Sequence, residues 1–107
     1  MSRKPTDFEM RVYTAASRVP RGRVTTYALL GQAIGCSSAR AVGQALKRNP
    51  FAPDVPCHRV IASDLSLGGF RGHRGTAALE DKAKLLMQEG VALRNGRLVD
   101  RDRVYGF

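Results

Sequence analysis

The chain has 107 residues, two cysteines and a net charge of +9, from 18 Lys and Arg against 9 Asp and Glu. This length predicts one domain over residues 1–107 and is too short for two. No apolar run approaches the ~20 residues that span a bilayer, and the charged N-terminus lacks a signal-peptide core, so we expect a cytoplasmic protein. Two cysteines cannot build a disulfide framework. The basic surplus favours a polyanionic partner, nucleic acid ahead of a membrane, over a merely solvated or thermostable surface.

The first predicted helix begins with a capping box. Thr6 can cap the helix and Glu9 can reach back to it, and apolar residues at helical spacing follow. We therefore predict a helix from about Asp7 to Arg18, ended by Pro20-Arg21-Gly22.

Two shorter helices are predicted next. Thr25 or Thr26 can cap a helix over 27–34, Gly35 closes it, and a serine cap opens a third helix over 38–48. Two short helices joined by a turn that contains glycine have the outline of a helix-turn-helix.

The third predicted helix has small residues among basic ones. Gly43 costs such a helix about 1 kcal/mol relative to alanine. Close packing on a neighbouring helix would offset that cost, as would close approach to DNA, and the residues alone favour neither. The small residues are Ala41, Gly43 and Ala45, and the basic ones are Arg40, Lys47 and Arg48.

The second half of the chain predicts mixed structure. Residues 60–62 predict a buried strand, and 63–75 form a basic, glycine-rich loop. Thr76 is predicted to cap a last helix that ends near Glu89, with Gly90 as its stop. Its predicted core-facing side chains are Leu79, Ala83, Leu86 and Met87.

Asn95-Gly96 lies between two apolar segments and predicts a hairpin that would form a small wing. The expected fold is therefore mainly α with a small β component, a winged helix-turn-helix-like DNA-binding domain.

Cys57 and His58 are adjacent, between apolar flanks. A cysteine nucleophile needs a neighbouring base or positive charge, which His58 or Arg59 could supply. Pro56 makes a rigid approach to the cysteine. For an isolated pair of this kind, a buried inert cysteine beside a surface histidine is the commoner outcome. A zinc site could be formed only by Cys36, Cys57, His58 and His73. It is disfavoured because the spacing of these residues matches no common zinc site.

The segment Val55-Pro56-Cys57-His58-Arg59-Val60, preceded by Asn49-Pro50, resembles the active-site signature of the O6-alkylguanine-DNA alkyltransferases. Proteins of that family repair DNA by taking the alkyl group onto their own cysteine. The resemblance runs from about Phe8 to Leu93 in order and spacing. Its other segments are Arg23–Tyr27, Ala39–Gly43, the glycine-rich loop and Glu89-Gly90.

The resemblance implies catalytic roles for four residues. Cys57 would accept the alkyl group, and His58 would deprotonate it through a water molecule. Glu89 would orient His58, as in other sets of nucleophile, base and orienting group. Asn49 would hold the turn around the cysteine.

The resemblance also implies a DNA interface and a base pocket. Arg40 would fill the gap left by a flipped nucleotide, and Tyr27 would crowd the adjoining phosphate. The other expected DNA-binding residues are Thr26, Ala41, Gly43, Lys47 and Arg71. The base pocket would be formed by Val60, Phe70 and Gly72. Arg59 is expected to be structural, paired with a carboxylate such as Asp54.

Two departures from the family's pattern bear on function. Full-length members usually carry an N-terminal α/β domain that this sequence does not include. Phe70 stands where a tyrosine is common, and Arg71 where a small residue is common. The alkyltransferase-like proteins are also short, but they lack the cysteine and sense lesions without repairing them. This chain keeps Cys57, which favours repair.

We therefore expect a single-turnover methylated-DNA–protein-cysteine methyltransferase. It would act on double-stranded DNA containing O6-alkylguanine, as a monomer, with no cofactor and no membrane partner. The alternative is a non-enzymatic lesion sensor that recruits nucleotide-excision repair proteins. A basic helix-turn-helix regulator with an inert Cys57 is the third hypothesis.

Overall fold

The computed structural model describes residues 4–52, 54–68 and 75–107. It is mainly α with a small β component, as predicted. In chain order the elements are α1 (Asp7–Ala16), β1 (Thr25–Thr26), α2 (Tyr27–Ala33), α3 (Ala39–Lys47), the 3₁₀ turn η1 (Cys57–Arg59), β2 (Val60–Ile61), α4 (Thr76–Gln88), β3 (Leu93–Arg94), β4 (Arg97–Leu98) and the 3₁₀ turn η2 (Arg101–Arg103).

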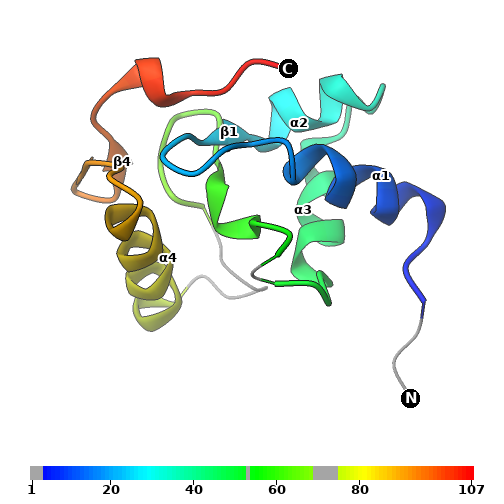
Figure 1. The fold of residues 1–107 in the computed structure, drawn as a ribbon, viewed down its shortest axis with the longest axis horizontal. Coiled ribbons are helices and arrows are strands. Elements are labelled where there is room, and N and C mark those ends of the chain that lie inside the picture. The colour runs from blue at the N-terminus through cyan, green and yellow to red at the C-terminus, as the bar shows by residue number, and fades with distance from the viewer. Residues whose placement is uncertain (1–3, 53, 69–74) are drawn as a thin grey trace.

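The helices form two groups, with η1 and the paired strands β1 and β2 between them. Helices α1, α2 and α3 pack on one another, and α4 lies on the other side of η1 (Figure 1). Val12, Leu30 and Val42 are fully buried at the centre of the first group. The Tyr13 hydroxyl donates to the carbonyl oxygen of Ala45 at 2.7 Å and joins α1 to α3. The helix-turn-helix is therefore braced by α1.

Side-chain caps fix where the first three helices begin. Thr6 and Glu9 form both hydrogen bonds of the predicted capping box. The hydroxyl of Thr26 accepts from the backbone N–H of Leu29, and that of Ser38 accepts from Ala41. The predicted cap at Thr76 is wrong: α4 begins at that residue, and its N-cap is Gly75, which has no side chain to use.

The second group holds α4 against the strands. β1 pairs in parallel with β2, Thr25 opposite Val60, which fixes the segment after η1 to the segment before α2. β3 and β4 form the predicted hairpin. Asn95 and Gly96 at its turn have φ of 52° and 74°, the left-handed values that a two-residue type I′ turn needs.

One predicted core residue of α4 is not buried. Leu86 is fully buried, but Met87 is 61% exposed. The buried face of α4 includes Lys82 in addition to Leu86, and Lys82 is 0% exposed. Among the helices of the described ranges, none has the length and apolar character to cross a membrane.

Candidate active site and nucleic-acid interface

Cys57 and His58 lie together in η1, and both are buried. Cys57 is 9% exposed and His58 is 5% exposed, so His58 is not a surface histidine. The Asn49 side chain braces the approach to this turn. Its Nδ2 donates to the carbonyl oxygen of Val55 at 3.0 Å, and its Oδ1 accepts from the backbone of Phe51 at 2.9 Å. Asn49 therefore joins the end of α3 to the segment that enters the cysteine turn.

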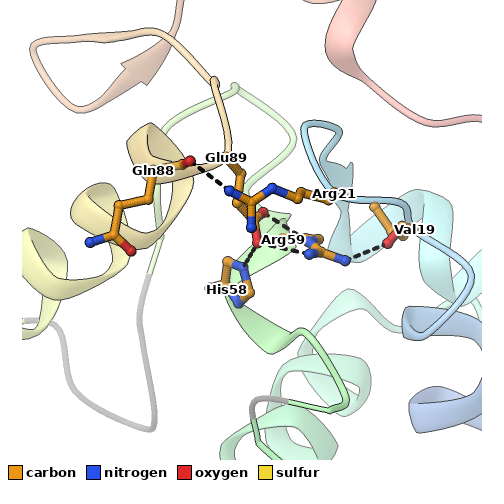
Figure 2. Close-up of polar contacts among 6 residues, drawn as sticks. All are labelled: Val19, Arg21, His58, Arg59, Gln88 and Glu89. Atoms are coloured by element: carbon orange, nitrogen blue, oxygen red, sulfur yellow. Dashed lines mark hydrogen bonds and ion pairs between the residues drawn. The ribbon is translucent and has the colours of Figure 1, made fainter.

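Glu89, at the C-terminal end of α4, faces His58 and Arg59 of η1 (Figure 2). His58 Nε2 lies 3.1 Å from Glu89 Oε2. Arg59 donates from Nε to Oε1 at 2.9 Å and from Nη2 to Oε2 at 2.7 Å, a two-pronged ion pair. Arg59 Nη1 also donates to the carbonyl oxygen of Val19 at 2.9 Å. The prediction that Arg59 pairs with Asp54 is wrong. Its partner is Glu89, which lies 30 residues away in the sequence at the end of α4.

Protonation of this cluster follows from its surroundings. Burial opposes the ionisation of Glu89, but hydrogen bonds from Arg59 and His58 outweigh it and lower the pKa of Glu89 to about 2. Burial is the largest influence on His58 and lowers its pKa below 6.5, although Glu89 partly offsets it. At neutral pH an ionised carboxylate only accepts, so the neutral imidazole carries its proton on Nε2. Nδ1 is then the nitrogen able to accept a proton.

Such an arrangement suits nucleophilic chemistry. A buried cysteine directly precedes a neutral histidine in one turn, and the imidazole is held by a carboxylate that is itself fixed by a guanidinium. Nucleophile, base and orienting group are the parts that activate a cysteine. The structure brings Glu89 to His58, in the turn that also holds Cys57, and Asn49 braces the segment that enters this turn.

Lys82 of α4 is a buried cation that the sequence analysis did not single out. Its Nζ donates to the carbonyl oxygens of Val60 at 2.7 Å and Leu67 at 2.6 Å. The signal was present in the sequence: Lys82 stands between Leu79 and Leu86 at helical spacing, on the apolar face.

The outer face of α3 carries a row of exposed or half-exposed residues: Arg40, Gly43, Gln44 and Lys47. Their spacing of three and four residues aligns them along one side. A Cβ added at Gly43 would meet nothing within 4 Å. Within the described residues, no neighbouring helix packs closely enough on Gly43 to explain a glycine there. Close approach by a binding partner is therefore the explanation that is left of the two. Ala41 is half-buried beside this row.

Tyr27 is half-buried at the start of α2. A Cβ added at Gly68, where φ is +70°, would lie 3.4 Å from Tyr27 Cε2, so the backbone before the glycine-rich loop passes close to this ring. Thr26 is 6% exposed, and its hydroxyl caps α2. Its role in DNA binding stays a prediction.

Part of the predicted base pocket can be placed. Val60 is fully buried, and its contact with a base stays a prediction. Phe70, Arg71 and Gly72 lie outside the described residues. His73, one ligand of the zinc alternative, does too; no group of three or more Cys, His, Asp or Glu side chains within 4–52, 54–68 and 75–107 could hold a metal ion.

Comparison with known proteins identifies relatives for this arrangement. A family model described as "6-O-methylguanine DNA methyltransferase, DNA binding domain" matches residues 7–91. The constitutive methylated-DNA–protein-cysteine methyltransferase of Bacillus subtilis is 41% identical over 95 residues, which cover 88% of this chain and 55% of that protein. The chain spans about half the length of most of the curated relatives that it matches.

Solved structures agree in fold. The O6-methylguanine-DNA methyltransferase from Pyrococcus kodakaraensis strain KOD1 superposes with a TM-score of 0.69 and 46% identity, over 80% of this chain and 47% of that one. S. pombe Atl1, in complex with damaged DNA containing O6-carboxymethylguanine, gives a TM-score of 0.82 and 28% identity, over 99% of this chain and 100% of that one.

Proposed function

Because the chain belongs to the O6-alkylguanine-DNA alkyltransferase family, we propose that it repairs DNA by moving the alkyl group of O6-alkylguanine onto Cys57. The observation that carries the proposal is the contact of 3.1 Å between His58 Nε2 and the carboxylate of Glu89, next to a buried cysteine. This contact leaves Nδ1 of a neutral imidazole free to take the thiol proton, through a water molecule.

The reaction is a displacement at the alkyl carbon. The thiolate sulfur of Cys57 attacks that carbon, the S–C bond forms as the bond from carbon to O6 breaks, and the electron pair stays on the guanine oxygen. Guanine then takes a proton on its ring nitrogen from solvent, and His58 returns the thiol proton to solvent, so the net change is one proton moved from sulfur to the base. None of the site residues that the structure describes can break the thioether, so we expect each molecule to act once.

DNA would meet the outer face of α3. Arg40 and Lys47 are exposed along it, and Gly43 offers a place where another surface can come close to the helix backbone. The alkylated oxygen of a stacked guanine is out of reach of a pocket on the minor-groove side, so the nucleotide must be turned out of the duplex. Arg40 would take its place in the stack, Tyr27 would crowd the adjoining phosphate, and Phe70 and Gly72 would close over the base. We propose a cytoplasmic monomer that needs no cofactor.

Lesion sensing without transfer is the second candidate function. The observation that favours it is the match to the whole of S. pombe Atl1, at a TM-score of 0.82. A sensor would bind O6-alkylguanine tightly, would keep that selectivity after Cys57→Ala, and would transfer nothing.

One experiment separates the two functions. The protein is incubated with a duplex containing O6-methylguanine, and its intact mass is measured; Cys57→Ala is the control. Transfer predicts a protein heavier by one methyl in place of the thiol hydrogen, and no change in the control. An unchanged mass together with full, lesion-selective binding would refute transfer and establish the sensor.

A further inference from the structure

The hairpin of β3 and β4 holds two arginines opposite each other. Arg94 and Arg97, the arginine pair, are register partners on either side of the Asn95-Gly96 turn. Directly opposite residues of an antiparallel pair project from the same face, with Cβ atoms about 4.5–5.5 Å apart. Successive side chains alternate between faces, and the neighbouring pair, Leu93 and Leu98, packs in the core. Both guanidinium groups are therefore carried on the outer face of the hairpin.

Little in the protein balances this double charge. Arg97 Nη2 lies 3.6 Å from Asp64 Oδ2, but the two side chains are 62% and 58% exposed, and an ion pair so open to water is weak. Asp64 also accepts a hydrogen bond of 2.6 Å from the hydroxyl of Ser66. Arg94 is exposed and makes no ion pair within residues 4–52, 54–68 and 75–107. Like charges directly opposite each other destabilise a hairpin, so a bound anion would relieve this one.

The hairpin continues the surface that the proposed function assigns to DNA. The backbone N–H of Leu67 donates to the carbonyl oxygen of Gly96 at 3.0 Å, which joins the turn of the hairpin to the segment after β2. The next residue, Gly68, passes so close to Tyr27 that an added Cβ would lie 3.4 Å from its ring. Tyr27 is the residue proposed to crowd the phosphate beside the lesion. One backbone segment thus lies between that tyrosine and the hairpin.

The size of the protein allows one duplex to reach both α3 and the hairpin. Along the longest axis of the molecule, the hairpin and α3 lie on opposite sides of residues 60–68 (Figure 1). This axis measures 36 Å, which is about one helical turn of B-DNA. A duplex carries one negative charge per about 1.7 Å of its axis, so phosphates are available along the whole of this length.

We propose that Arg94 and Arg97 bind the phosphate backbone of the duplex that flanks the lesion. The inference rests on the proposed function and adds a second point of attachment to the contact made by α3. A guanidinium binds phosphate through two parallel hydrogen bonds, and the hairpin holds two such groups at a fixed separation. Arg97 would exchange Asp64 for a phosphate. Because phosphate contacts carry no sequence information, the arginine pair would strengthen binding to damaged and undamaged DNA alike.

Binding titrations at several salt concentrations test this proposal. The probes are a duplex containing one O6-methylguanine and the same duplex with guanine in its place. Loss of one phosphate contact lowers the slope of log K against log salt by about 0.9, so Arg94→Gln should have this effect on both duplexes. Arg94→Lys keeps the charge and should keep the slope. Lys84→Gln, which removes an exposed charge of α4, is the matched control and should also leave the slope unchanged.

Replacing Asp64 should act in the opposite direction. Asp64→Asn releases Arg97 for a phosphate, so affinity for both duplexes should rise. This gain should disappear when Arg97→Gln is also present, because the two changes then act through one contact. A gain of the same size in the presence of Arg97→Gln would be general attraction of DNA and would contradict an exchange of partners by Arg97.

Truncating the duplex locates the contact. The difference between the parent and Arg94→Gln should disappear when the DNA on one side of the lesion is removed and should persist when the other side is removed. A difference that survives both truncations would overturn a contact with flanking DNA, as would a folded Arg94→Gln protein with the parental slope. If the parent repairs DNA and that slope is parental, this inference fails and the proposed function stands. If the parent binds DNA but transfers no methyl, and the slope falls as expected, the proposed repair fails and the arginine contact stands.

Discussion

Replacing Glu89 by glutamine should remove one of the largest electrostatic contributions to stability. The carboxylate is hydrogen-bonded to Arg59 and His58, its side chain is 9% exposed, and its pKa falls from 4.5 to about 2 on folding. A lowering of that size corresponds to about 3 kcal/mol in favour of the folded protein at neutral pH. Because the pKa is lower in the folded state, the stabilisation is complete above pH 4.5 and is lost as the pH falls toward about 2.

Urea unfolding at several pH values measures this directly. Glu89→Gln should lower the free energy of unfolding by about 3 kcal/mol at neutral pH, and the gap to the wild type should narrow on acidification. Glu80→Gln, an exposed glutamate of the same helix, is the matched control and should change it by less than about 0.5 kcal/mol. A loss below about 1 kcal/mol, or one that is the same at every pH, would refute the account of the cluster.

Three further predictions concern DNA binding and pH. Gly43→Ala should stabilise the protein by up to about 1 kcal/mol, because alanine is the better helix former and a Cβ here would meet no neighbouring part of the protein within 4 Å. The same change should weaken DNA binding, and unchanged affinity in a binding titration would contradict close approach at this residue. Arg40→Ala should abolish the fluorescence change of 2-aminopurine placed beside a lesion, which reports base flipping, and should change the salt dependence of binding little. Lys47→Ala is the comparison: it should lower the slope of log K against log salt by about 0.9 if Lys47 contacts one phosphate. The single-turnover rate of transfer should fall as acidification below pH 6.5 protonates His58, and a rate that rises on acidification would exclude His58 as the base.

Local signals made the helix starts and the hairpin predictable. A threonine or serine before an apolar helix can satisfy an orphan backbone N–H by itself, as Thr6, Thr26 and Ser38 do. Asn95-Gly96 sets its own turn. The prediction of Thr76 as an N-cap failed because a capping side chain must belong to the residue that precedes the helix, and that residue is Gly75.

The site was predictable only where residues are adjacent or where the resemblance supplied their roles. Cys57 and His58 are neighbours in sequence, and the family resemblance predicted that Glu89 pairs with His58. The partner of Arg59 was chosen for nearness in sequence, whereas the packing of α4 decides which carboxylate arrives. Lys82 went unnoticed for the same reason, since its partners are backbone carbonyls whose positions depend on the fold.

The stoichiometry of methyl transfer tests the central claim most directly. The protein is titrated with a duplex containing O6-methylguanine, and the methyl groups on protein are counted and located by peptide mapping. The account predicts that transfer saturates at one methyl per molecule, all of it on the peptide that contains Cys57. Methyl on another residue, continued turnover beyond one, or no transfer at all to a protein that binds the duplex would contradict it.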